Sequence, residues 1–147
     1  MATSPSQVFE SYIRTTPAQL WQALTDGALT QQYYYGISVE STWQPGAPYR
    51  YATPAGSLIE GEVLEVEAPR RLMTTFRPLW QPGMADLPES TVTWVIEPMG
   101  EASKLTLIHT GLDPANPLTG AIMGGWNQIL SGLKTLLETG RPLAVGT

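Results

Sequence analysis

The segment NPLTGAIMGGWNQILSGLKTLLETG, residues 116–140, determines the fold class. Asn116 followed by Pro117 is a helix-start signal, because asparagine caps the first turn and proline suits the first helical position. Apolar residues then recur with helical spacing and form one stripe, made by Trp126, Ile129, Leu130, Leu133, Leu136 and Leu137. Gly140 ends the pattern. The sequence therefore predicts a long amphipathic helix over residues 117–139.

The region before this helix predicts six strands, because apolar and polar side chains alternate with a period of two between turn-forming residues. The predicted strands are 37–43, 49–51, 58–67, 72–77, 90–97 and 104–111. Residues 78–89, with three prolines, a glycine and Trp80, predict a long, partly ordered loop. Consecutive strands with short connections form an antiparallel meander, and the C-terminal helix is the element long enough to cover its apolar face.

The N-terminal region predicts one more strand and two short helices. Residues 8–14 alternate as a strand with Phe9 and Ile13 on one face. Thr16 caps a first helix that starts at Pro17, and Asp26 caps a second. We therefore predict an α+β chain with a curved antiparallel sheet of about seven strands. We expect a single domain over residues 1–147, with an ordered core over residues 7–140.

The composition excludes several classes of function. The chain has 147 residues, 42% of them hydrophobic, which suffices for one core. A net charge of −5 without a basic stripe argues against nucleic acid and anionic membrane partners. The absence of cysteine excludes thiolate catalysis and cysteine-ligated metal centres. The N-terminus MATSPSQ lacks signal-peptide features and no stretch approaches 18 apolar residues, so we expect a cytoplasmic protein.

Five segments match a known family in order along the chain: PAQLWQALTDGAL at 17–29, GEVLEVEAPRRL at 61–72, STVTWVIEP at 90–98, KLTLIHTGL at 104–112 and GWNQILSGLKTLLETG at 125–140. They resemble the START/SRPBCC superfamily, in the branch of stand-alone bacterial proteins related to the C-terminal domain of heat-shock-protein ATPase activators. The resemblance implies a helix-grip fold with an apolar cavity between sheet and helix, and it supplies no invariant catalytic set. One departure is the run Gln32-Tyr33-Tyr34-Tyr35-Gly36, where the family often has a tryptophan near the pocket mouth.

Tryptophan and tyrosine dominate the aromatic residues, with five and six copies against two phenylalanines. Each combines an apolar body with a polar tip, which suits a ligand cavity with a wet edge. We predict that the ligand is bound by Tyr34, Tyr51, Phe76, Trp80, Trp94, His109, Met123 and Trp126. For each of these residues, an ordinary place in the core or at its rim is the alternative.

Titratable residues give weaker signals. His109, the single histidine, could act as a general base, but a histidine hydrogen-bonded within the sheet is the favoured interpretation. Alternation places Glu60 and Glu62 on one face of their strand and Glu65 and Glu67 on the other, which favours solvated carboxylates over an acid–base pair. One histidine and no carboxylate-rich loop predict no metal, and scattered glycines predict no nucleotide or other cofactor.

Four glycines interrupt the C-terminal helix, namely Gly120, Gly124, Gly125 and Gly132. Each costs about 1 kcal/mol relative to alanine in a helix interior. Three explanations remain open: close packing on the sheet, space for a ligand, or a helix that begins at Gly120 or later.

Three functions remain open. The favoured one is binding of a small apolar or aromatic molecule, lipid or polyketide-like, between sheet and helix, with no assignable catalytic set. The second is a cyclase- or hydrolase-like enzyme that uses His109 or a tyrosine hydroxyl in the same cavity. The third is a chaperone ATPase co-activator, which the name of the resembled family suggests. An exposed edge strand and the tyrosine-rich mouth also leave a homodimer open.

Overall fold

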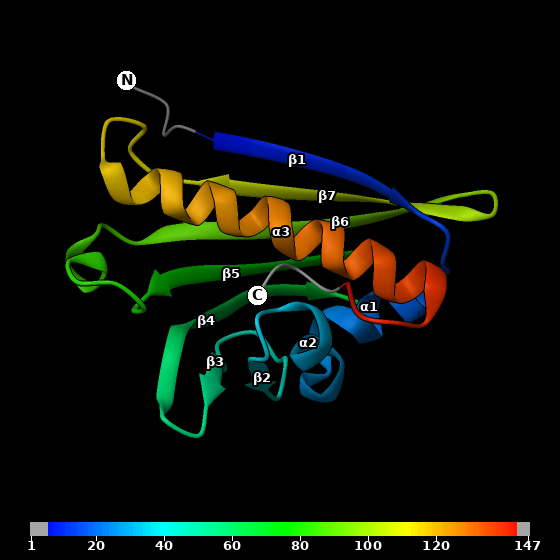
Figure 1. The fold of residues 1–147 in the computed structure, drawn as a ribbon, viewed down its shortest axis with the longest axis horizontal. Helices are drawn as coiled ribbons and strands as arrows, with labels where there is room; N and C mark the ends of the chain where they lie inside the picture. The colour runs from blue at the N-terminus through cyan, green and yellow to red at the C-terminus, as the bar shows by residue number, and fades with distance from the viewer. Residues whose placement is uncertain (1–5, 144–147) are drawn as a thin grey trace.

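The computed structural model describes residues 6–143 and contains one antiparallel sheet of seven strands (Figure 1). Their order across the sheet is β1-β7-β6-β5-β4-β3-β2. The strands are β1 Ser6–Ile13, β2 Ser38–Ser41, β3 Pro48–Thr53, β4 Gly56–Glu67, β5 Arg71–Pro78, β6 Ser90–Met99 and β7 Ala102–Thr110. The helices are α1 Pro17–Thr25, α2 Gly27–Tyr33, the 3₁₀ turn η1 Met84–Asp86 and α3 Pro117–Thr139. The predicted α+β class and element order are confirmed.

Helix α3 lies along one face of the sheet and buries its apolar stripe there (Figure 1). The side chain of Asn116 accepts a hydrogen bond from the Leu118 amide at 2.9 Å, and Gly140 ends the helix with a left-handed φ of 77°. Both ends agree with the predicted signals. The alternative of a start at Gly120 or later is wrong, because the asparagine cap already closes the first turn at Pro117. Among residues 6–143, no helix is long and apolar enough to cross a membrane.

Two elements differ from the prediction. Strand β2 ends at Ser41, two residues short of Trp43, because Trp43 has a φ of 57° and leaves the extended conformation. Its indole instead donates to the Thr25 carbonyl at 3.0 Å and joins β2 to α1. The loop between β5 and β6 contains η1, and the side chain of Met84 within it is completely buried. A buried apolar side chain therefore anchors the middle of this loop.

The predicted faces of the β4 glutamates are also wrong. The register between β4 and β5 shifts at Val63 and Glu65, which is a β-bulge. Val63 lies opposite Thr74 and Val66 lies opposite Leu72, so both valines point to the same face although they are three residues apart. The bulge returns Glu65 and Glu67 to the outer face that carries Glu60 and Glu62. The extra residue of the bulge breaks the alternation of side chains along β4, so all four glutamates lie on one face of the strand. They remain accessible to solvent there, as predicted.

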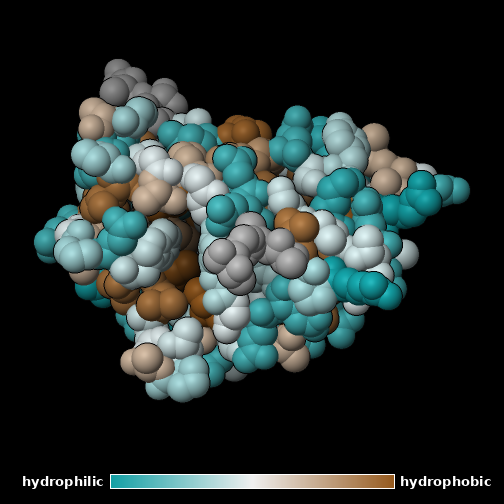
Figure 2. Space-filling model, viewed as in Figure 1, coloured by the Kyte–Doolittle hydropathy of each residue, from teal (hydrophilic) through white to brown (hydrophobic). Residues whose placement is uncertain are grey.

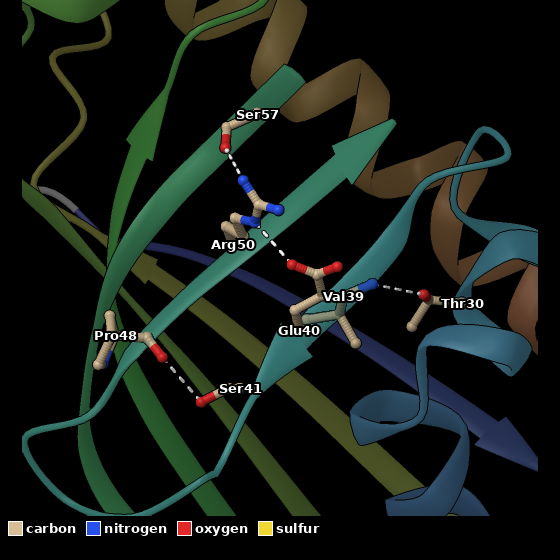
Figure 3. A network of polar contacts seen from close by, with 7 residues as sticks. All are labelled: Thr30, Val39, Glu40, Ser41, Pro48, Arg50 and Ser57. Atoms are coloured by element: carbon tan, nitrogen blue, oxygen red, sulfur yellow. Dashed lines mark hydrogen bonds and ion pairs between the residues drawn. The ribbon is translucent and has the colours of Figure 1, made fainter. Parts of the chain in front are cut away.

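Thr30 connects α2 to β2 (Figure 3). Its completely buried hydroxyl lies 2.9 Å from the Ile37 carbonyl, to which it donates, and accepts from the Val39 amide at 3.0 Å. On the outer face of the sheet, which is the face turned away from α3, Arg50 of β3 pairs with Glu40 of β2 at 2.6 Å and contacts Ser57 of β4 (Figure 3). Thr30 thus connects the middle of α2 to the start of β2, and Tyr34 and Tyr35 lie in the segment between these elements.

The sheet opens locally where β4 passes Gly61. The Glu62 amide donates to the Thr75 hydroxyl at 2.8 Å, and the Thr75 carbonyl accepts from the Tyr49 hydroxyl at 2.5 Å. A Cβ on Gly61 would lie 2.5 Å from that carbonyl and 2.6 Å from the Tyr49 ring. Side chains therefore replace part of the backbone ladder here, and only glycine leaves room for them.

Candidate ligand-binding cavity

A cavity of about 490 Å³ lies between α3, strands β4 and β5, and the segment that follows α2. Figure 2 shows hydrophobic residues gathered in a hollow beneath α3, where the cavity opens. The described residues that line it are Tyr34, Tyr35, Ile37, Leu58, Ile59, Phe76, Trp80, Ala121, Ile122, Gly124, Gly125, Trp126, Gln128 and Ile129. None of these fourteen residues is Asp, Glu, Lys, Arg or His, so the wall is apolar with hydroxyl and amide groups at a few points.

Glycines in α3 create part of this space. Gly124 and Gly125 line the cavity, and a Cβ on Gly124 would meet nothing within 4 Å. Gly132, further along the helix, serves close packing instead, since its Cβ would lie 3.3 Å from the Cβ and the carbonyl oxygen of Tyr33. Close packing therefore explains Gly132, whereas Gly124 and Gly125 border open space, and the use of that space by a ligand stays a prediction.

The Tyr33–Gly36 run forms one side of the mouth. Tyr35 and Gly36 both have positive φ values, 53° and 73°, which turns the chain sharply after α2. The half-exposed Tyr35 donates its hydroxyl to the Gln128 side chain at 2.6 Å, so the segment after α2 is joined to α3 across the mouth. Tyr34 points inward and is 3% exposed. The departure from the family pattern thus lies at the cavity itself.

Trp126 is the centre of the aromatic wall. Its ring packs edge-to-face on Tyr34, Trp94 and His109, and lies tilted against Phe76, with centroid distances of 5.6–6.2 Å. Behind these side chains is a hollow of about 10 Å³, which is about the smallest space that can hold one water molecule. Tyr51 and Trp94 line that hollow together with Tyr34, Phe76 and Trp126. The aromatic side chains therefore form a continuous layer from the cavity into the core.

His109 is part of a buried hydrogen-bond chain that supports this wall. The Trp126 indole donates to the His109 Nδ1 at 2.9 Å, and an indole nitrogen can only donate, so the ring proton of His109 lies on Nε2. That Nε2 donates to the Ser90 hydroxyl at 2.8 Å, and Ser90 in turn donates to the Phe76 carbonyl at 3.3 Å. Burial lowers the pKa of His109 to about 4, so the imidazole is neutral at physiological pH. Both ring nitrogens are occupied within the core.

The sequence-predicted ligand residues fall into three places. Tyr34, Phe76, Trp80 and Trp126 line the cavity, with Trp80 at its rim and 37% exposed. Tyr51 and Trp94 line the hollow behind it. His109 lies behind Trp126, and Met123 packs against the core outside the lining set. Contact between any of the eight and a ligand stays a prediction.

The predicted ligand residues left out the rest of the wall, which is formed by Tyr35, Ile37, Leu58, Ile59, Ala121, Ile122, Gly124, Gly125, Gln128 and Ile129. Most are aliphatic or glycine and carry no chemical signal that separates a cavity wall from a core. The tyrosine run and the helix glycines were the two available signals. Within residues 6–143, no group of three or more His, Asp or Glu side chains could hold a metal ion.

The model of the family described as Activator of Hsp90 ATPase homolog 1-like protein matches residues 14–138. The chain belongs to this family. The match covers both short helices, six of the seven strands and nearly all of α3. A search of curated proteins found no match.

Several solved structures share the fold of this chain. Protein MLL2253 from Mesorhizobium loti is 26% identical, with a TM-score of 0.77 over 90% of this chain and 96% of that one. PFC0360w, described as an HSP90 activator from Plasmodium falciparum, is 21% identical, with a TM-score of 0.73 over 90% and 95%. The Aha1 dimer from Colwellia psychrerythraea is 13% identical, with a TM-score of 0.75 over 92% and 98%. Similarity at the last two identities shows the shared fold alone.

Proposed function

We propose that this member of the Activator of Hsp90 ATPase homolog 1-like family binds a small apolar or aromatic molecule in the cavity beneath α3. One observation carries the proposal: a space of about 490 Å³ remains between α3 and the sheet, and its wall is apolar and aromatic. Ligand sites typically have volumes of about 300–1,000 Å³ and such a wall. Gly124 and Gly125 keep the helix side of the space open at a cost in helix propensity, which supports a use for the space.

Native mass spectrometry of the protein purified under mild conditions from its own source tests this proposal. A bound small molecule near one-to-one ratio, released on denaturation, is the expected result. Quenching of tryptophan fluorescence by a panel of apolar aromatic compounds gives an independent readout, because Trp80 and Trp126 lie in the wall. An unliganded mass together with no quenching by any member of the panel contradicts the proposal.

The enzyme alternative has less support. A histidine base needs a ring nitrogen that faces the substrate, whereas both nitrogens of His109 bond to Trp126 and Ser90. A tyrosine hydroxyl would have to act in its place. Turnover of a cavity ligand that survives in His109→Asn but is lost in a Tyr→Phe variant would revive this alternative.

Chaperone co-activation is a second candidate, which is favoured by the family description and by the fold shared with the Plasmodium falciparum HSP90 activator. The test is the ATPase rate of a purified Hsp90-class chaperone with and without an excess of this protein. Stimulation together with a stoichiometric complex supports this function. An unchanged rate without complex formation argues against it and leaves the binding proposal intact.

A homodimer is a separate proposal that rests on the Colwellia psychrerythraea neighbour, which was solved as a dimer. Strand β1 lies at one edge of the sheet with Val8 58% and Tyr12 51% exposed, and these side chains could contribute to such an interface. Light scattering over a concentration series distinguishes the monomer mass of 16.0 kDa from twice that value.

A further inference from the structure

Two buried tyrosines differ from their neighbours in how their hydroxyls are used. The hydroxyls of Tyr33, Tyr35 and Tyr49 each donate to a protein acceptor: the Ala23 carbonyl at 2.7 Å, the Gln128 side chain at 2.6 Å and the Thr75 carbonyl at 2.5 Å. Among residues 6–143, the hydroxyls of Tyr34 and Tyr51 have no such partner, although these residues are only 3% and 7% exposed. A buried hydroxyl without a partner is costly.

These two hydroxyls are not sealed into the core. Within the described residues, Gln7 Oε1 is the single side-chain oxygen or nitrogen that is fully buried and has no hydrogen-bond partner. The hydroxyl oxygens of Tyr34 and Tyr51 also have no partner, so they are not fully buried. The Tyr34 and Tyr51 oxygens therefore retain contact with accessible space. Tyr34 lines both the cavity and the small hollow behind it, whereas Tyr51 lines the hollow alone, so Tyr34 is the member of the two that borders the cavity.

The two rings form one unit, called here the tyrosine pair. They are stacked, with centroids 4.3 Å apart and planes at 24°. Burial first, and then the neighbouring Tyr51 hydroxyl, raise the pKa of Tyr34 well above its ordinary value, and burial does the same for the pKa of Tyr51. Both hydroxyls therefore keep their protons at any physiological pH and are available as hydrogen-bond donors.

The rest of the cavity wall restricts the charge of the ligand. None of the fourteen lining residues carries a charge, so a ligand carboxylate or ammonium would lose its hydration without gaining a counter-ion. Free fatty acids and other organic acids are poor ligands on this argument. An uncharged ring system with one acceptor oxygen satisfies both the apolar wall and the donors.

We propose that the tyrosine pair is the polar anchor of the cavity and selects uncharged aromatic ligands that carry a carbonyl oxygen. The aromatic body lies among Trp126, Phe76 and the α3 glycines, and the carbonyl accepts from the Tyr34 hydroxyl, while Tyr51 stacks on the Tyr34 ring from the hollow behind the wall. This inference rests on the proposed function, because it names the ligand class of the same cavity.

Three probes of nearly equal shape test it: 2-acetylnaphthalene, 2-ethylnaphthalene and 2-naphthoate. Titration calorimetry and tryptophan quenching measure their affinities near neutral pH. We expect 2-acetylnaphthalene to bind at least about fivefold more tightly than 2-ethylnaphthalene, the effect of about one net neutral hydrogen bond, and 2-naphthoate to bind most weakly. In Tyr34→Phe/Tyr51→Phe, which keeps both rings, the preference for the acetyl over the ethyl compound should disappear while 2-ethylnaphthalene binding persists.

Tyr33→Phe is the matched control, because its hydroxyl already bonds to Ala23 and it is outside the cavity lining. It should retain the wild-type preference. Equal wild-type affinities for the acetyl and ethyl compounds, a preference that survives in the double variant, or 2-naphthoate binding as tight as 2-acetylnaphthalene would each overturn the anchor while leaving ligand binding intact. Binding of none of the three probes contradicts the proposed function itself.

Discussion

Ser90, His109 and Trp126 show how one polar side chain can organise an aromatic wall. Each donor in their chain has one acceptor, so the ring of Trp126 is fixed by a hydrogen bond as well as by packing. In the same arrangement both ring nitrogens of His109 bond to Trp126 and Ser90, so neither is directed at the cavity as a general base would be. Its role is to hold the Trp126 indole in place.

The buried imidazole makes stability depend on pH. The unfolded chain binds a proton on His109 at its ordinary pKa of 6.5, whereas in the folded chain burial lowers this pKa to about 4. The folded state therefore loses stability as the pH falls from about 6.5 to about 4, by about 2–3 kcal/mol in total. Urea unfolding of the wild type and of His109→Asn at neutral pH and at a pH close to the folded-state pKa measures this effect.

His109→Asn provides the control because it can still accept from Trp126 but does not titrate. The wild type should lose up to about 2–3 kcal/mol more than the variant between the two pH values. Carboxylates titrate equally in both proteins and cancel in the comparison. An identical pH dependence in both would show that His109 is not neutral and buried in solution.

Gly61 gives a second prediction for a single residue. In Gly61→Ala the new methyl group would overlap the Thr75 carbonyl and the Tyr49 ring, so we expect a loss of about 1–3 kcal/mol in the free energy of unfolding. Gly120→Ala is the matched control, since Gly120 is an exposed helix position with nothing within 4 Å of the new Cβ. It should gain about 0.5–1 kcal/mol. An unchanged free energy of unfolding in Gly61→Ala would contradict this prediction, because it would mean that β4 and β5 move apart around the new methyl group without loss of stability.

The cavity wall was only partly predictable residue by residue. Tyr34, Phe76, Trp80 and Trp126 were singled out because aromatic residues are informative, and all four line the cavity. Ile37, Leu58 and Ile122 also line it, but an aliphatic side chain looks the same in a wall and in a core. The contact of Tyr35 with Gln128 joins positions 93 apart, which no local pattern could indicate.

Among the elements, α3 and its caps were predictable because the signals are local: Asn116, the apolar stripe and Gly140. Strand details depended on tertiary contacts. β2 ends early because Trp43 turns toward α1, and the bulge in β4 exists only relative to its partner β5. The predicted faces of Glu65 and Glu67 failed for this reason. Periodicity finds a strand, but its partner strand determines where an extra residue is accommodated.

Thr30 tests the connection between α2 and β2. Thr30→Val keeps the shape but removes the acceptor for the Val39 amide and the donor to the Ile37 carbonyl. Because these groups are buried, we expect a loss of about 1–3 kcal/mol in the free energy of unfolding. Thr106→Val at a half-buried position of β7 is the control and should be nearly neutral. Equal effects of the two substitutions in guanidinium unfolding would contradict the role of Thr30.

For the whole molecule, the cavity is a property of the assembled fold, with walls from β4, β5, α3 and the segment after α2. The overall architecture followed from element order and one covering helix. The volume of the cavity could not be predicted in this way, because it depends on the distance between α3 and the sheet, which no sequence pattern gives.

Gly124→Leu tests the cavity as a whole. The new side chain has open space before it and should fill part of the ligand volume, so we expect affinity for 2-acetylnaphthalene to fall at least about tenfold. Thermal stability should be unchanged or higher, since leucine favours helix more than glycine does. Gly120→Leu, outside the lining set, should bind the probe as the wild type does. Unchanged affinity in Gly124→Leu would place the probe elsewhere on the protein.

The pairing of β1 with β7 has a consequence for how the chain reaches this structure. The hydroxyls of Ser6 and Thr110 lie 3.1 Å apart although 104 positions separate them in the chain. A strand whose only sheet neighbour is so distant gains no pairing energy until that neighbour exists, and closing such a loop costs conformational entropy. During synthesis, β1 leaves the ribosome before β7 and has no sheet partner until β7 has emerged. High contact order of this kind slows folding, and during that interval β1 is an unpaired strand open to pairing with wrong partners.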